Sequence, residues 1–264
     1  MKILSILIAL LVNYRWPNLS RWRQYQWLLA PAANSARSGP DWRPTAVLIA
    51  TSLIAGLAAT ALAHAVAGMF GLLIVGTATL WYTLGPRGLD TDIESVLEHE
   101  PGARQAALDR LMLTEASSPG LAASAAVHAA LARWFGVIFW FVFLGPAGCL
   151  MYRAVREAVH CHQLPDTRRR FASHALGILN WPVMLVLIGA LALVTDYDRV
   201  LDAFRRREDR WRFPVALIDD LCLELCASET DLGQGLRDGR QLAWRVLMLW
   251  LVVLSVLMLA GLLS

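Results

Sequence analysis

Residues 45–84 run without a single Asp, Glu, Lys or Arg side chain. A membrane-spanning helix needs about 20 mostly apolar residues, because the hydrocarbon core of a bilayer is about 30 Å thick and a helix rises about 1.5 Å per residue. The stretch is therefore long enough for two helices, and His64, Gly68 and Gly71 mark the turn between them. We predict that residues 45–84 form a transmembrane helical hairpin.

A second uncharged stretch lies near the C-terminus. Between residues 246 and 263 the only polar side chain is that of Ser255, and Trp244 and Arg245 stand just before this run. An Arg next to a Trp at one end of an apolar run is typical of an anchor at the membrane–water interface. Residues 244–264 are therefore predicted to form a transmembrane helix.

The composition also favours a membrane protein. Hydrophobic residues make up 57% of the chain and charged residues 17%, with a mean hydropathy of +0.48, whereas soluble domains have about 25% charged residues. A net charge of +3 indicates no basic face, so no nucleic-acid partner is expected. The cysteines, at positions 149, 161, 222 and 226, fit no disulfide framework. We predict an all-α fold, a polytopic helical membrane protein with polar helical lobes and the lipid bilayer as its partner.

Residues 134–194 hold two further apolar segments, and both contain a proline. The first, residues 134–152, is interrupted by Gly145 and Pro146; a proline removes one helical hydrogen bond and clashes with the preceding turn. In lipid such a break persists only where neighbouring protein satisfies the freed carbonyl groups. The segment is therefore expected to be either a kinked span or a re-entrant hairpin. Residues 178–194 are expected to form a short span or a half-inserted segment.

Residues 1–44 are predicted to form an interfacial region. Residues 1–12 are apolar but too short to cross a bilayer alone, so we expect a short helix that lies in the interface or packs in the bundle. A signal peptide is not expected, because no A-x-A-like cleavage site follows. Under the positive-inside rule, eight Arg residues place residues 195–243 on the cytoplasmic side. We assign residues 85–133 to the same side, and the side of residues 153–177 stays open.

The polar segment 85–133 opens with a cluster of acidic residues, namely Asp90, Asp92, Glu94, Glu98 and Glu100. Carboxylates bind Mg²⁺ in proteins, but acidic side chains are also favoured in the first turn of a solvent-exposed helix by the helix dipole. We favour the solvent-exposed helix. The run His160-Cys161-His162 has no matching Cys or His pair at zinc spacing. We therefore predict no metal site and no cofactor.

The polar lobe 195–243 carries three consecutive arginines at 205–207, which would attract anionic headgroups at a membrane surface. Its glycines are expected in a loop; they are Gly233, Gly235 and Gly239. Without a preceding strand this loop matches no phosphate-binding motif. The chain also contains no Walker motif, no G-x-S-x-G and no H-E-x-x-H. The sequence therefore identifies no catalytic residue.

Several short motifs resemble one superfamily. They are Phe135-Gly136-Val137-Ile138-Phe139-Trp140, Gly145-Pro146-Ala147-Gly148, Tyr152-Arg153, Arg87-Gly88-Leu89, and the element with Asn180 and Pro182. Their order is similar to that in the AmpE/CobD-CbiB superfamily of bacterial membrane proteins. The CobD/CbiB branch consists of adenosylcobinamide-phosphate synthases, which are ligases that use ATP and Mg²⁺. The AmpE branch is linked to beta-lactamase regulation and peptidoglycan recycling, as an inner-membrane partner of the AmpD amidase.

The positions that carry the chemistry in the synthase branch lack its acidic motifs here. The synthases have E-N-x-x-D ahead of the Phe-Trp pair, where this chain has His128, Ala129 and Ala132. They also have N-T-x-D after Tyr-Arg, where residues 156–159 read Arg-Glu-Ala-Val. Phosphoryl chemistry needs carboxylates to hold Mg²⁺. The resemblance therefore favours the AmpE branch.

The resemblance implies a signalling or regulatory modulator of the bacterial inner membrane, active in the response to beta-lactam antibiotics. Its implied partner is an AmpD-type amidase or another cell-wall recycling protein. The alternatives are a divergent synthase of the CobD/CbiB type and a small-molecule membrane carrier, which the proline-broken segments would suit. Six residues are the candidates for ligand binding: Arg87, Asp90, Asp92, His128, Arg153 and Asn180.

Overall fold

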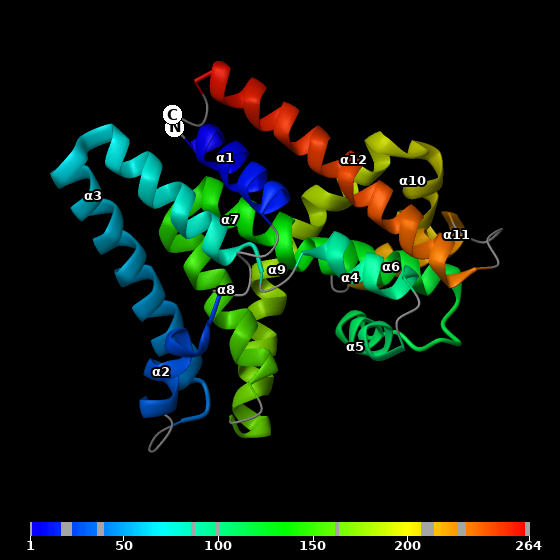
Figure 1. The fold of residues 1–264 in the computed structure, drawn as a ribbon, viewed down its shortest axis with the longest axis horizontal. Coiled ribbons are helices and arrows are strands. Elements are labelled where there is room, and N and C mark those ends of the chain that lie inside the picture. The colour runs from blue at the N-terminus through cyan, green and yellow to red at the C-terminus, as the bar shows by residue number, and fades with distance from the viewer. Residues whose placement is uncertain are drawn as a thin grey trace. The chain divides into compact units, whose positions relative to one another are not determined.

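A computed structural model describes residues 2–16, 23–35, 40–85, 88–98, 101–161, 164–206, 214–225 and 231–261. Throughout these ranges the regular structure is helical and no strand occurs (Figure 1). Four of the described helical segments are long and apolar enough to cross a bilayer: Arg43–Thr83, Pro119–Leu144, Asp166–Val194 and Leu232–Leu259. The protein is therefore an all-α, polytopic helical membrane protein, as the sequence predicts.

The chain divides into two compact units. The first unit combines Met1–Pro86 with Gly136–Trp181, and the second combines Arg87–Phe135 with Pro182–Ser264. The first contains α1 (Lys2–Arg15), α2 (Gln26–Ser35), α3 (Arg43–Thr83), α7 (Gly136–Leu144), α8 (Pro146–His160) and the start of α9 (Asp166–Val194). The second contains α4 (Leu89–Leu97), α5 (Pro101–Leu111), α6 (Pro119–Ala130), a π-helical turn (Leu131–Phe135), the rest of α9, α10 (Tyr197–Arg206), α11 (Pro214–Leu225) and α12 (Leu232–Leu259).

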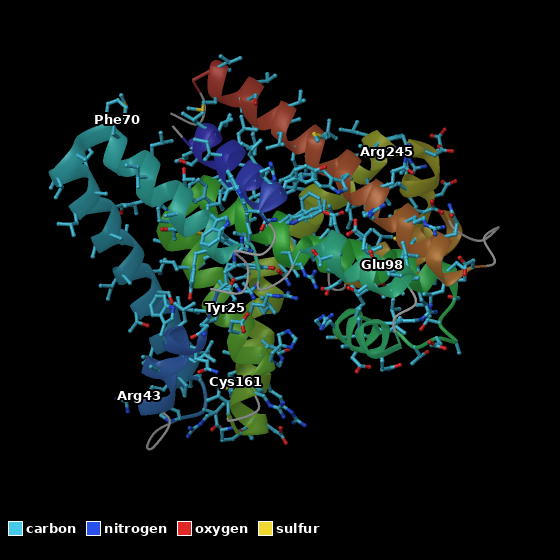
Figure 2. The ribbon with its side chains drawn as sticks, viewed as in Figure 1. Tyr25, Arg43, Phe70, Glu98, Cys161 and Arg245 are labelled. Carbon is cyan, nitrogen blue, oxygen red and sulfur yellow. The ribbon has the colours of Figure 1, made fainter. Side chains whose placement is uncertain are left out.

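The long helix α3 is broken into two arms at Gly68, where φ is 54°. Glycine adopts this left-handed conformation at no steric cost, whereas other residues are strained there. Figure 1 shows the bend in cyan, and Figure 2 labels Phe70 beside it. Gly71 lets the arms approach, because a Cβ atom there would lie 2.9 Å from the carbonyl carbon of Ala63. The predicted break between two apolar helices is confirmed.

Both arms of α3 present large apolar side chains on their surface. Those that are exposed are Ile54, Leu57, Leu62, Val66, Met69, Phe70 and Ile74. Contiguous apolar surface of this kind is unfavourable in water and suits contact with lipid chains. The exposure of α3 therefore follows from its place in a membrane protein.

The apolar segment 134–152 reverses direction at Gly145, where φ is 62°. α7 ends just before this residue, α8 begins just after it, and the two helices pack against each other. The packing is close, since a Cβ atom at Gly148 would lie 2.9 Å from the carbonyl carbon of Trp140. A continuous helix would separate these two residues by about 12 Å along its axis. The segment therefore forms a helical hairpin at Gly145, and its re-entry into the membrane stays a prediction.

The N-terminal helix α1 packs in the bundle of the first unit. Its buried residues are Ser5, Ile6 and Ala9, and its neighbours are α3 and α7. The Lys2 ammonium group donates a hydrogen bond to the carbonyl oxygen of Val142 at 3.0 Å. Of the two arrangements expected for residues 1–12, packing in the bundle is therefore the one observed.

The last long helix, α12, begins at Leu232, ahead of the predicted transmembrane segment. The loop predicted at Gly233, Gly235 and Gly239 is therefore wrong, because all three glycines lie inside this helix. The last two pack against α6, and a Cβ atom at Gly239 would lie 2.7 Å from the Cα atom of Ala123. Small residues let two helix backbones approach this closely. Here glycine serves helix packing and not a turn.

This packing predicts opposite effects for two alanine substitutions in the second unit. Gly239→Ala forces α12 away from α6, and overpacking of this kind costs about 1–3 kcal/mol. Gly189→Ala adds a methyl group on α9 where no atom lies within 4 Å, and alanine is favoured over glycine in a helix by about 1 kcal/mol. Thermal unfolding in detergent should show a lower midpoint for the first variant and an unchanged or higher one for the second. Equal midpoints would contradict the packing argument.

Candidate functional site

The second unit holds a fully buried carboxylate at Asp92, which is 0% exposed. The residue lies in the first turn of α4. Its Oδ1 atom accepts a hydrogen bond from Arg110 Nε at 2.9 Å, and its Oδ2 atom accepts one from Arg133 Nη2 at 2.6 Å. Both oxygen atoms are thus engaged by guanidinium groups from other helices. The predicted solvent-exposed acidic turn is therefore wrong at Asp92, because two distant arginines stabilise the charge in the interior.

The neighbouring acids on α4 face α12. Trp244 Nε1 donates to Asp90 Oδ1 at 3.2 Å, and the guanidinium of Arg240 lies 4.0 Å from that oxygen and 3.8 Å from Glu94 Oε1. These contacts fix α4 against α12. In the described part of the chain, no group of three or more His, Cys, Asp or Glu side chains is placed to hold a metal ion. Three acids of the cluster, Asp90, Asp92 and Glu94, therefore form ion pairs with arginines of other helices.

His128 lies on α6 and pairs with Asp219 on α11. The distance from His128 Nε2 to Asp219 Oδ1 is 2.8 Å, and the hydroxyl of Ser124, one helical turn earlier, donates to the same oxygen. In a catalytic triad the histidine stands between the hydroxyl and the carboxylate. Here both donors contact the carboxylate instead. The three side chains therefore link α6 to α11 in an arrangement that differs from a triad.

A pocket of about 210 Å³ opens in the second unit near this contact. The polar side chains that line it are Thr195, Asp238, Gln241 and Arg245. Gln234 donates to Asp238 Oδ1 at 3.1 Å, so this carboxylate is already engaged on one side. Of the candidate ligand-binding residues that the structure describes, none lines this pocket.

In the first unit the predicted residue Arg153 is buried on α8, at 2% exposed. Its Nη2 atom pairs with Glu157 Oε1 at 2.5 Å, and its guanidinium lies 4.2 Å from the ring centroid of Tyr25. The hydroxyl of Tyr25 donates in turn to the carbonyl oxygen of Tyr82 at 2.7 Å. The candidate ligand-binding residue Arg153 is therefore buried, with Glu157 and Tyr25 as its described contacts.

Asn180 on α9 accepts a hydrogen bond at Oδ1 from the hydroxyl of Tyr152, at 2.9 Å. Tyr152 is fully buried on α8, directly before Arg153. One residue earlier on α9, the carbonyl oxygen of Leu179 accepts a hydrogen bond from Trp140 Nε1 at 3.2 Å. Asn180 is thus part of the contact that holds α9 against α7 and α8.

Arg23 is a buried residue that the sequence did not single out, at 5% exposed. One of its amino groups donates to the carbonyl oxygen of Gly85, and the other donates to Asn13 Oδ1 at 2.8 Å. Its guanidinium lies 4.7 Å from the ring centroid of Trp81. Burial, together with the nearby charge of Arg153, lowers the pKa of Arg23 to about 10. The residue was missed because it is one of several arginines in a polar connection, and composition does not reveal which of them is buried.

The described residues among the six ligand-binding candidates belong to two different units. Arg87 lies outside the described residues. Asp90, Asp92 and His128 belong to the second unit, and Arg153 and Asn180 belong to the first. The two aspartates have different described partners, namely Trp244 and Arg240 for Asp90 and two arginines for Asp92, and the described partner of His128 is Asp219. In each unit the described candidates make side-chain contacts with other residues of that unit.

The fold and these contacts define the class of the protein as a helical membrane protein with charged side chains buried between its helices. No family model, curated protein or solved structure matches the chain. The assignment to the AmpE branch therefore stays a prediction from the sequence motifs.

Proposed function

We propose that this chain is a non-catalytic signalling or regulatory modulator of the bacterial inner membrane, similar to AmpE. It would act in beta-lactamase induction and peptidoglycan recycling, with an AmpD-type amidase or another cell-wall recycling protein as its partner. The observation that carries the proposal is the complete burial of Asp92. Both of its oxygen atoms are held by arginines in the interior of the second unit.

This observation weighs against the alternative of a CobD/CbiB-like synthase. Such an enzyme needs carboxylates that hold Mg²⁺ and orient the phosphates of ATP. Asp92 is fully buried between two guanidinium groups, and Asp90 contacts Trp244 and Arg240. The acids that would have to replace the missing synthase motif therefore do not fit a Mg²⁺ site. Their contacts hold the helices of the second unit together.

Two complementation assays test the proposal. The chain is expressed in a host that has an inducible beta-lactamase and lacks its own AmpE, and in a host that lacks adenosylcobinamide-phosphate synthase. We expect it to alter beta-lactamase induction, measured by nitrocefin hydrolysis after exposure to a beta-lactam. We expect no corrinoid synthesis from cobyric acid in the second host.

Asp109→Ala is the control variant for both assays, because it removes an exposed acid from α5 of the second unit. It should alter induction as the unmodified chain does. Restored corrinoid synthesis would contradict the proposal and favour the synthase. An unchanged induction profile, with the chain detected in the membrane fraction, would contradict the modulator function.

A further inference from the structure

Among the described residues of the first unit, the buried charged side chains are more often positive than negative. Arg23 and Arg153 are 5% and 2% exposed, and Arg156 follows one turn later on the half-buried part of α8. In the described part of the chain, the carboxylate in contact with this group is that of Glu157, which pairs with Arg153. Burial lowers the pKa of Arg156, and Arg153 lowers it further. Of these three guanidinium groups, that of Arg153 has a carboxylate partner among the described residues.

Arg23 has no carboxylate among its described hydrogen-bond partners. Its amino groups donate to the carbonyl oxygen of Gly85 and to the amide oxygen of Asn13, both of which are uncharged. The Nε atoms of Arg23 and Arg153 are buried, and neither has a hydrogen-bond acceptor among the described residues. A buried charge is costly unless it is paired and its donors are satisfied. The cluster therefore has both excess positive charge and unused donors.

The cluster lies where a membrane-facing helix ends. Trp81 and Tyr82 belong to the last turn of α3, and Tyr82 packs against the ring of Tyr25 with 5.2 Å between the ring centroids. Trp27, which is largely exposed, donates to the hydroxyl of Tyr82 at 2.7 Å. Trp and Tyr gather in this way at the level of the lipid headgroups. Figure 2 labels Tyr25 within the first unit.

We propose that Arg23 and Arg153 form a binding site for a phosphate group at the membrane interface, with Trp27 and Tyr82 at its edge. A phosphate supplies the missing negative charge and accepts the unused N–H groups, because a guanidinium presents a planar fork that matches phosphate oxygens. The phosphate belongs to an anionic phospholipid or to a soluble phosphate. The site uses residues of the first unit, whereas the carboxylates that support the proposed function belong to the second.

The test uses the full chain reconstituted in nanodiscs. One sample contains phosphatidylcholine alone, a second contains phosphatidylcholine with phosphatidylglycerol, and a third contains phosphatidylcholine with added inorganic phosphate. Thermal unfolding is measured in each, and native mass spectrometry records retained lipid. A higher midpoint only with phosphatidylglycerol supports the site with a lipid as its source. A higher midpoint with inorganic phosphate supports it with a soluble phosphate as its source.

Two variants separate the site from general charge attraction. Arg23→Gln keeps a side-chain donor but removes the charge, and we expect about a ten- to hundred-fold loss of affinity for the phosphate-bearing ligand. Arg15→Gln removes an exposed charge from α1 in the same unit and should bind as the unmodified chain does. If Arg23→Gln does not fold, Arg153→Gln replaces it, with the same expected loss. The proposal would be overturned if neither phosphatidylglycerol nor inorganic phosphate stabilised the unmodified chain. Equal binding by the Arg23 and Arg15 variants would also overturn it.

Discussion

Replacing Asp92 by alanine is expected to lower the free energy of unfolding by about 3–5 kcal/mol, because breaking a buried ion pair leaves its partner charge uncompensated. The carboxylate is fully buried and is shared by Arg110 and Arg133. Its removal leaves both guanidinium groups without their common anion. Denaturation of the detergent-solubilised protein with increasing SDS, followed by circular dichroism, measures the change.

Two further variants define this effect. Asp109→Ala removes an exposed carboxylate from α5 of the same unit and should change the free energy by no more than about 0.5 kcal/mol. The double variant of Asp92→Ala with Arg133→Gln should lose less than the sum of the two single variants, because the residues are in contact. Additive losses, or equal losses at Asp92 and Asp109, would contradict the ion-pair account.

The second large loss in the free energy of unfolding is expected when Tyr152 is truncated. Its ring is fully buried beside Gly136, where a Cβ atom would lie 2.7 Å from the Cε1 atom of the tyrosine. Truncating a buried aromatic side chain leaves a cavity, so Tyr152→Ala should cost about 3–5 kcal/mol. Tyr152→Phe keeps the ring and removes only the hydrogen bond to Asn180, which should cost about 1 kcal/mol. The same SDS titration measures both variants.

Tyr14→Ala is the matched control, because this tyrosine of α1 is exposed. Its free energy of unfolding should stay close to that of the unmodified chain. A Phe variant as unstable as the Ala variant would show that the hydroxyl, and not the ring, supports the contact between α8 and α9.

The apolar run 45–84 and the break at Gly145 were predictable from the sequence, because lipid imposes a minimum length on an apolar helix. The apolar segments expected at 134–152 and 178–194 have other bounds in the structure, where the candidate spans are Pro119–Leu144 and Asp166–Val194. The uncharged run 45–84 and the break at Gly145 both appear where the sequence places them. At Gly145 the sequence left open whether the chain kinks or reverses. The close approach of Gly148 to Trp140 decides this, and it depends on packing that no local pattern encodes.

The partners of the buried charges were not predictable. Acidic residues near a helix start favour solvent in general, and the burial of Asp92 depends on Arg110 and Arg133, which lie 18 and 41 residues away. Arg23 poses the same problem, since its neighbours Gly85 and Trp81 come from the far end of α3. Contacts of such sequence separation are tertiary, and a single sequence gives only the residues that could make them.

The uncharged turn of α3 also bears on how the hairpin enters a membrane. A charged side chain at the centre of a membrane-spanning helix raises the cost of insertion by about 2.5–3.5 kcal/mol. Around Gly68 the chain carries Val66, Met69 and Phe70, and no Asp, Glu, Lys or Arg occurs between Arg43 and Thr83. Beyond Arg43 at its start, α3 therefore has no Asp, Glu, Lys or Arg side chain that must be dehydrated during biogenesis. The two arms can be delivered into lipid as a single preformed element.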